Sequence, residues 1–179
     1  MPWLYGLLIC TLLGVSQAVA ESSNPALPAP QTVAFLGLYL HNDNEALEPT
    51  TAAERSRIEK VVAAFQARLD ASGRYQVIIP PPDVERQIRA GQTPGACNGC
   101  EIAYAKETGG DLVAWITVQK VSNLILNMNV YIGDVKANKL IFVHSVDIRG
   151  NTDESWTRSL NYLLDNYLFA EPGRHAATQ

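Results

Sequence analysis

The nine-residue run 32–40 (TVAFLGLYL) constrains the fold of this chain more than any other feature. Its side chains are almost all apolar and of types that favour β-strands, and they do not alternate with polar ones. A strand with this pattern is covered on both faces, so it belongs inside a sheet on which helices pack. The sequence therefore predicts an α/β fold.

The segments after this strand alternate between helical and strand patterns. Thr51 and Glu54 have the spacing of a capping box at a helix start, and apolar residues then recur at helical spacing up to Gly73. The order β-α-β-α-β-β-β-α predicts a single mixed β-sheet with helices packed on it. The other expected elements are strands at 75–79 and 111–121, a hairpin of 124–132 and 140–148 across a turn at 136–139, and helices at 83–89, from Cys100 to Thr108, and from about 152 onward.

The apolar positions of these strands and helices define the expected core. Between residues 111 and 148 both strand faces are partly apolar, so the pattern alone does not say which face meets the helices. The expected core residues are Val33, Phe35, Val61, Phe65, Leu69, Val77, Ile79, Val113, Trp115, Ile116, Val118, Leu160, Leu163 and Leu164.

Residues 1–20 have the pattern of a cleavable signal peptide. An apolar run leads to Ala18 and Ala20, which are small residues at the −3 and −1 positions of a signal-peptidase site. The run is shorter than the about 20 residues of a membrane span, so we expect cleavage after Ala20 and no stable membrane anchor afterwards. The expected location is the periplasm. Residues 21–31 are predicted to be a flexible linker, residues 32–169 one α/β domain and residues 170–179 a disordered tail.

Charge and motif content argue against two classes of function. The signal segment has no charged side chain, so the mature chain keeps the net charge of −4, and its scattered lysines and arginines do not form a stripe that could follow phosphates. Nucleic acid is therefore not an expected partner. The three histidines are dispersed, and no G-x-S-x-G, G-x-G-x-x-G or G-x-x-x-x-G-K motif occurs. We expect neither a catalytic centre nor a cofactor.

Cys97 and Cys100 form the sharpest local motif, and three interpretations of it remain open. The interpretation we favour is a structural disulfide, because an even number of cysteines in an oxidising compartment favours pairing. Thiol–disulfide exchange is the second, since C-x-x-C at a helix start is its usual pattern. Metal binding is the third, although zinc needs four ligands and no second cysteine pair exists. Haem attachment is excluded because Glu101 stands where a histidine is required.

Polar residues gather on the predicted hairpin and at the start of the last helix. They include the arginine and aromatic types that dominate interface energetics, and so predict a docking surface for a partner. The alternative is structural, with Arg149 paired to Asp147 or Asp153 and the tryptophan in the core. Oxygen ligands in the same region suggest a small-ligand or metal site, although turn chemistry also explains them. The candidate docking residues are Asn127, Asn129, Arg149, Asn151, Asp153 and Trp156.

Four strings carry a resemblance to a known family. They are CNGC at 97–100, GDLV at 110–113, VQKVSNLILN at 118–127 and SVDIRGNTDESW at 145–156. With them, the chain resembles an exported bacterial family of unknown function, number 3280, for which 2380 is a related label. At the level of fold the element order is similar to the amino-terminal domain of the TolB translocation protein, and to periplasmic domains of curli-secretion and peptidoglycan-synthase-activating lipoproteins. This resemblance implies a TolB-like fold and action through protein–protein contact.

Three functional hypotheses follow. The first is a non-enzymatic periplasmic binding or assembly module whose partner is a periplasmic or envelope protein. The second is a thiol–disulfide or electron-transfer accessory protein that acts through Cys97 and Cys100. The third is a protein that binds a small ligand or a metal at the polar hairpin.

Overall fold

The strand predicted first, β1 (Gln31–Asn42), lies inside a five-stranded sheet with the order β2-β1-β3-β4-β5. β2 (Tyr75–Ile78) and β3 (Leu112–Lys120) are parallel to β1 on its two sides. β4 (Ile125–Asp134) and β5 (Lys139–Arg149) extend the sheet as an antiparallel pair. The predicted single mixed sheet is therefore confirmed.

These observations come from a computed structural model that describes residues 29–170. The predicted signal peptide at 1–20, the linker up to residue 28 and the tail from residue 171 lie outside the described residues. Among the described residues, no helix has the length and apolarity needed to cross a membrane.

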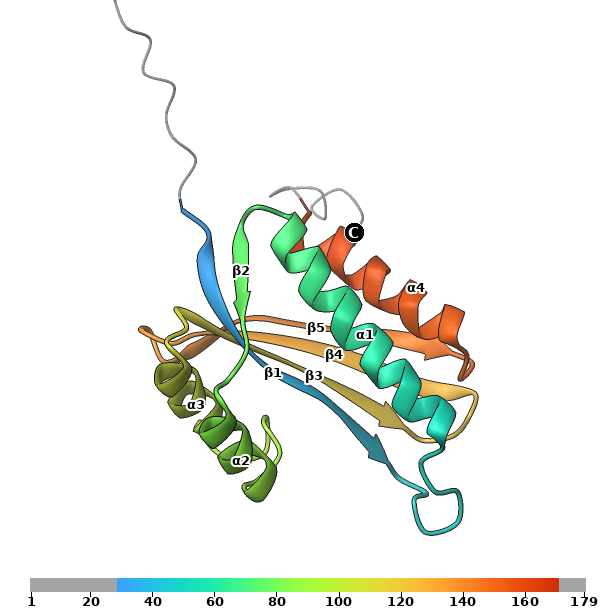
Figure 1. Ribbon diagram of the computed structural model, residues 1–179. Coiled ribbons are helices and arrows are strands. Elements are labelled where there is room, and N and C mark those ends of the chain that lie inside the picture. Colours follow the sequence, from blue (N-terminus) through green and yellow to red (C-terminus); the bar gives the residue numbers. More distant parts are fainter. Residues whose placement is uncertain (1–28, 171–179) are drawn as a thin grey trace, which may run out of the picture.

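Helices pack on both faces of the sheet (Figure 1). α1 (Ala52–Ala71) and α4 (Asp153–Leu163) lie side by side on one face, and the π-helical turn η1 (Leu164–Leu168) continues α4. α2 (Pro82–Ala90) and α3 (Cys100–Thr108) pack on the other face. Both helices predicted between β2 and β3 are therefore present, although the predicted order of elements counted only one there.

The expected core is largely confirmed. Val33, Phe65 and Leu160 belong to a large cluster beneath α1 and α4, and Val113 and Trp115 belong to a smaller cluster beneath α2 and α3. The expectation for Ile79 was wrong, because its side chain is 55% exposed. β2 is a short edge strand that ends at Ile78, so the next residue is only partly covered. Val77 is only partly buried.

Local chemistry sets the ends and bends of these elements. Thr51 and Glu54 form the predicted capping box at the start of α1. Gly37 lies at a shift of register in β1 and has a φ of +113°, a conformation that residues with a side chain rarely adopt. Beyond this bulge, Leu38 and Leu40 point to the α1 face again.

α2 and α3 cover only one end of their face of the sheet, and this determines where polar residues are tolerated (Figure 1). Side chains alternate between faces along a strand, so Val113, Trp115, Thr117 and Gln119 of β3 share the α2–α3 side. The first two are buried, Thr117 is half-buried and Gln119 is exposed. The apolar character of β3 on this face therefore ends where the helices end.

Candidate functional site

Polar side chains from three neighbouring strands form an open sheet face beyond α2 and α3. The strand register aligns them in rows: Thr117 of β3 lies opposite Asn129 of β4, which in turn lies opposite Ser145 of β5. The open sheet face consists of Thr117, Gln119, Asn127, Asn129, Ser145, Asp147 and Arg149.

Hydrogen bonds hold the two asparagines of this face in fixed orientations. The Asn129 amide donates to Thr117 Oγ1 at 3.2 Å and accepts a short hydrogen bond from the Ser145 hydroxyl. The Asn127 amide donates to the main-chain oxygen of Val146 at 3.3 Å. Because these contacts are made within the face, the amides present a preset pattern of donors and acceptors to solvent.

Arg149 is an exposed charged residue of this face, and its side chain makes no internal contact. Within residues 29–170 it has no hydrogen-bond or ion-pair partner, so the alternative that paired it with Asp147 or Asp153 is wrong. Asp153 pairs instead with Arg57 at 2.9 Å and with Lys60 at 2.5 Å. Both pairs link the start of α4 to α1.

The structure separates the six candidate docking residues into two groups. Asn127, Asn129 and Arg149 share the open sheet face, whereas the other three lie where β5 enters α4, next to the start of α1. Trp156 is 0% exposed, so the alternative that placed it in the core holds and its ring is not available to a partner. Its Nε1 donates to Asn151 Oδ1 at 3.0 Å.

Asn151 connects this second group to a buried ion pair that the sequence did not reveal. Its amide donates to Glu54 Oε1 at 2.7 Å, and Lys120 Nζ lies 2.7 Å from the same oxygen. The Lys120 and Glu54 side chains are only 3% and 1% exposed. A lysine at the end of a strand gives no sequence signal of burial, because it usually points to solvent.

The electrostatics of Glu54 reflect this network. Burial raises the pKa of its carboxyl, but hydrogen bonds from Lys120, from the Thr51 amide and from Asn151 outweigh burial and lower the pKa from 4.5 to about 2. Glu54 therefore stays ionised in the folded protein. Its contacts tie together the start of α1, the end of β3 and the turn before α4.

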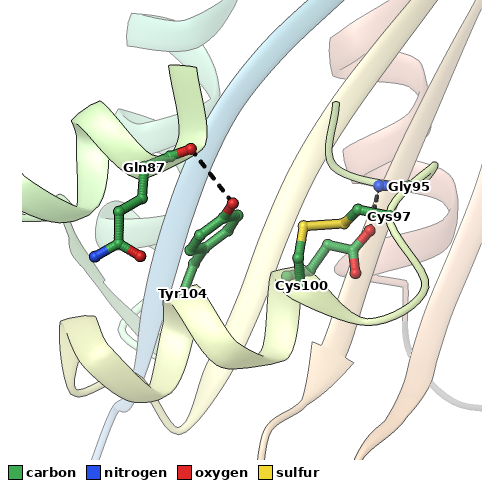
Figure 2. Close-up of a disulfide and its surroundings, with 6 residues drawn as sticks. Gln87, Gly95, Cys97, Cys100 and Tyr104 are labelled. Carbon is green, nitrogen blue, oxygen red and sulfur yellow. Dashed lines mark hydrogen bonds between the residues drawn. A yellow bond between two sulfur atoms is a disulfide. The ribbon is translucent and has the colours of Figure 1, made fainter. Parts of the chain in front are cut away.

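Cys97 and Cys100 form a disulfide at the start of α3, as expected (Figure 2). One turn further, the Tyr104 hydroxyl donates to the main-chain oxygen of Gln87 in α2 at 3.4 Å. Among the described residues, Cys97, Cys100 and Glu101 are the one group of His, Cys, Asp or Glu whose ligand atoms converge, within 4.8 Å. The two sulfurs are bonded to each other. The polar hairpin residues, in contrast, are not brought together into such a group.

Comparison with known proteins places the chain in a family. The chain belongs to the DUF3280 family, described as "Protein of unknown function (DUF2380)", whose sequence model matches residues 31–168. This match confirms the family resemblance predicted from the sequence. No curated protein matches the chain at a significant level.

Solved structures of low sequence identity have a related shape. The LpoB C-terminal domain from Salmonella enterica is 9% identical, with a TM-score of 0.48 over 70% of this chain and 87% of that one. Lipoprotein GNA1162 from Neisseria meningitidis is 16% identical, with a TM-score of 0.48 over 77% of this chain and 99% of that one. The PelC dodecamer from Paraburkholderia phytofirmans is 16% identical, with a TM-score of 0.48 over 80% and 91%. Likenesses at this level transfer neither an activity nor a partner, and the similarity to TolB stays a prediction.

Proposed function

We propose that this protein is an exported, non-enzymatic binding or assembly module whose partner is a periplasmic or envelope protein. The observation that carries the proposal is the open sheet face with its unpaired Arg149. A sheet face that helices cover at one end only, and that keeps polar side chains in fixed orientations at the other, suits recognition of another protein surface. The signal-peptide pattern of residues 1–20 supports export.

Arg149 is the residue to test, because arginine is enriched at the centres of interfaces and this one is not used internally. Arg86 offers a matched control, since it is exposed on α2 and has no partner among the described residues. The mature chain and its Arg149→Glu and Arg86→Glu variants would be immobilised and incubated with a periplasmic extract. Bound proteins would be quantified by mass spectrometry.

We expect at least one protein to be retained by the parent and by Arg86→Glu, and to be reduced about 30-fold on Arg149→Glu, the change that corresponds to loss of a hot-spot contact of about 2 kcal/mol. Thermal melting of all three proteins should agree within about 2 °C, because both changes are on the surface. Equal capture by the two variants would contradict the proposal. So would a parent chain that retains no protein above the level of an empty support.

A second candidate function rests on the disulfide. Cys97 and Cys100 are only half-buried and stand at the start of α3, where helix amides stabilise a thiolate. On this hypothesis the pair exchanges with the thiols of a client protein. Equilibration with glutathione separates the two cases. A reduction potential well below about −300 mV indicates a structural bond, and one near the range of the oxidoreductases supports redox function.

A further inference from the structure

The indole N–H of Trp115 is buried and has no hydrogen-bond partner among the described residues. The side chain is 3% exposed and its ring stacks on Tyr131, with ring centroids 4.9 Å apart. Its Nε1 is buried, and it is the one buried side-chain nitrogen or oxygen in the described part of the chain that has no hydrogen-bond partner. Buried donors in folded proteins are nearly always paired, so this N–H needs an acceptor from outside the chain.

A cavity lies next to this nitrogen. It has a volume of about 310 Å³ and sits between the loop that precedes α3 and the turn that joins β4 to β5. The nitrogen edge of the indole faces Gly95, because a Cβ placed on that glycine would lie 3.1 Å from Nε1. Gly95 has no side chain, so only its main chain lies against this edge of the indole, at the wall of the cavity. The lining residues are Gly95, Asn98, Gly99, Glu101, Ile102, Trp115, Asn138, Lys139 and Leu140.

The second polar group of the cavity is the carboxylate of Glu101, which is itself buried. The Gly95 amide, next to the disulfide in Figure 2, donates a short hydrogen bond to Glu101 Oε1 and leaves the other oxygen as an acceptor. The cavity therefore offers one donor, Trp115 Nε1–H, and one acceptor, a Glu101 oxygen. Apolar atoms of Ile102 and Leu140 complete its wall.

The donor of Trp115 and the acceptor of Glu101 together restrict the charge and the polar groups that a ligand of this cavity can have. A carboxylate or phosphate would be repelled by Glu101, and a simple cation would leave the Trp115 N–H unpaired. A secondary amide satisfies both groups, since its carbonyl oxygen accepts from Trp115 and its N–H donates to Glu101. Its methyl or methylene flank would contact the apolar wall. The side chains at the rim, Asn98, Asn138 and Lys139, suit further hydroxyl or carbonyl groups.

We propose that this cavity binds a small neutral ligand through a secondary amide, with Trp115 as donor and Glu101 as acceptor. The site is separate from the open sheet face and does not depend on the proposed partner. Two sources supply this chemistry, an acetamido sugar and a blocked amino acid. N-acetylglucosamine and N-acetylalanine methylamide represent them as probes, and glucose and glucosamine, which have no amide, are the controls.

The test is a nitrogen–proton correlation spectrum of the ¹⁵N-labelled mature chain, which has two tryptophans, Trp115 and Trp156. Trp156→Phe assigns the two indole signals. Trp156 is an internal control, because its N–H is already bonded to Asn151. Each probe would be added up to about 50 mM, well above the Kd of roughly 1 mM that a ligand of this size reaches with a few good contacts.

We expect the Trp115 indole signal to move saturably with at least one amide probe and with neither control, while the Trp156 signal stays in place. The probe that acts identifies the source of the amide. In ligand-observed spectra, Trp115→Phe, which keeps an aromatic ring but removes the N–H donor, abolishes binding, and Glu101→Gln weakens it. A Trp115 signal that neither amide moves would overturn the proposal, because the N–H then has only trapped water as its acceptor. A signal that moves equally with glucose would also overturn it.

Discussion

Replacing Lys120 by methionine measures how much of the fold depends on one buried ion pair. Lys120 Nζ lies 2.7 Å from Glu54 Oε1, with both side chains almost fully buried. Removing one partner of a buried pair typically costs about 3–5 kcal/mol, because the other charge remains buried without its counter-charge. Since Glu54 would keep its hydrogen bonds from Thr51 and Asn151, we expect a loss of about 3 kcal/mol, the lower end of that range.

Removing the other partner of the pair, with Glu54→Met, should lower the free energy of unfolding by more than Lys120→Met does. Glu54 is the one partner of Lys120 Nζ within the described residues, and it also closes the capping box of α1 with Thr51. We therefore expect a loss of about 4–5 kcal/mol. The double variant removes both charges and leaves neither unpaired, so its loss should be smaller than the sum of the single losses by about 2 kcal/mol or more.

Urea unfolding followed by tryptophan fluorescence tests this reasoning. With an m-value of about 2 kcal/mol/M, the midpoint of Lys120→Met should fall by about 1.5 M. Lys136→Met, at the exposed turn between β4 and β5, is the control and should change the free energy of unfolding by less than about 0.5 kcal/mol. A Lys120→Met protein as stable as this control, or strictly additive single losses, would refute the assigned role of the pair.

Acid titration gives a second measure of the same network. The folded-state pKa of Glu54 is about 2, against 4.5 for an unperturbed carboxyl, so protonation favours the unfolded chain. The resulting stabilisation, about 3 kcal/mol, is fully present above pH 4.5 and is lost as the pH falls towards 2. In Glu54→Gln the decline in unfolding free energy between these pH values should be smaller by about that amount. An unchanged decline would show that other carboxyls account for it.

Three further outcomes are expected. Replacing Cys97 and Cys100 by alanine should lower the free energy of unfolding by about 2 kcal/mol, because closing so short a loop restricts the unfolded chain only a little. A loss above about 5 kcal/mol would mean that the disulfide does more than restrict the unfolded chain. Thr152→Ala should lower the free energy of unfolding, measured by chemical denaturation, by about 1 kcal/mol, because the Thr152 side chain accepts a hydrogen bond from the Ser155 amide at the start of α4. No change would indicate that another group caps the helix. Amide exchange should be slowest in β3, between two paired strands and beneath helices on both faces, and fast exchange there would contradict the assigned core.

Much of the fold was predictable because the features that set it are local. The run at 32–40 gave a buried strand, the Thr51 and Glu54 spacing gave the start of α1, and the C-x-x-C spacing favoured the disulfide. Hydrophobic periodicity and turn residues act over a few positions, so a single sequence records them. The expectation failed at Ile79, where burial depends on which strand lies at the edge of the sheet.

The candidate site was only half predictable, for the opposite reason. The sequence identified Asn127, Asn129 and Arg149 as polar positions on a hairpin, but it could not separate them from Trp156. The turn after β5 leads onto the α1 face of the sheet, where Trp156 is buried.

Two buried polar features, the Lys120–Glu54 ion pair and the unpartnered indole nitrogen of Trp115, depend on residues that are far apart in the chain and pack together only in the fold. The sequence by itself determined the elements and their apolar stripes. Only the tertiary structure decided which polar groups lose water and which remain open to a partner. Desolvation depends on everything that packs around an atom, and no local pattern records it.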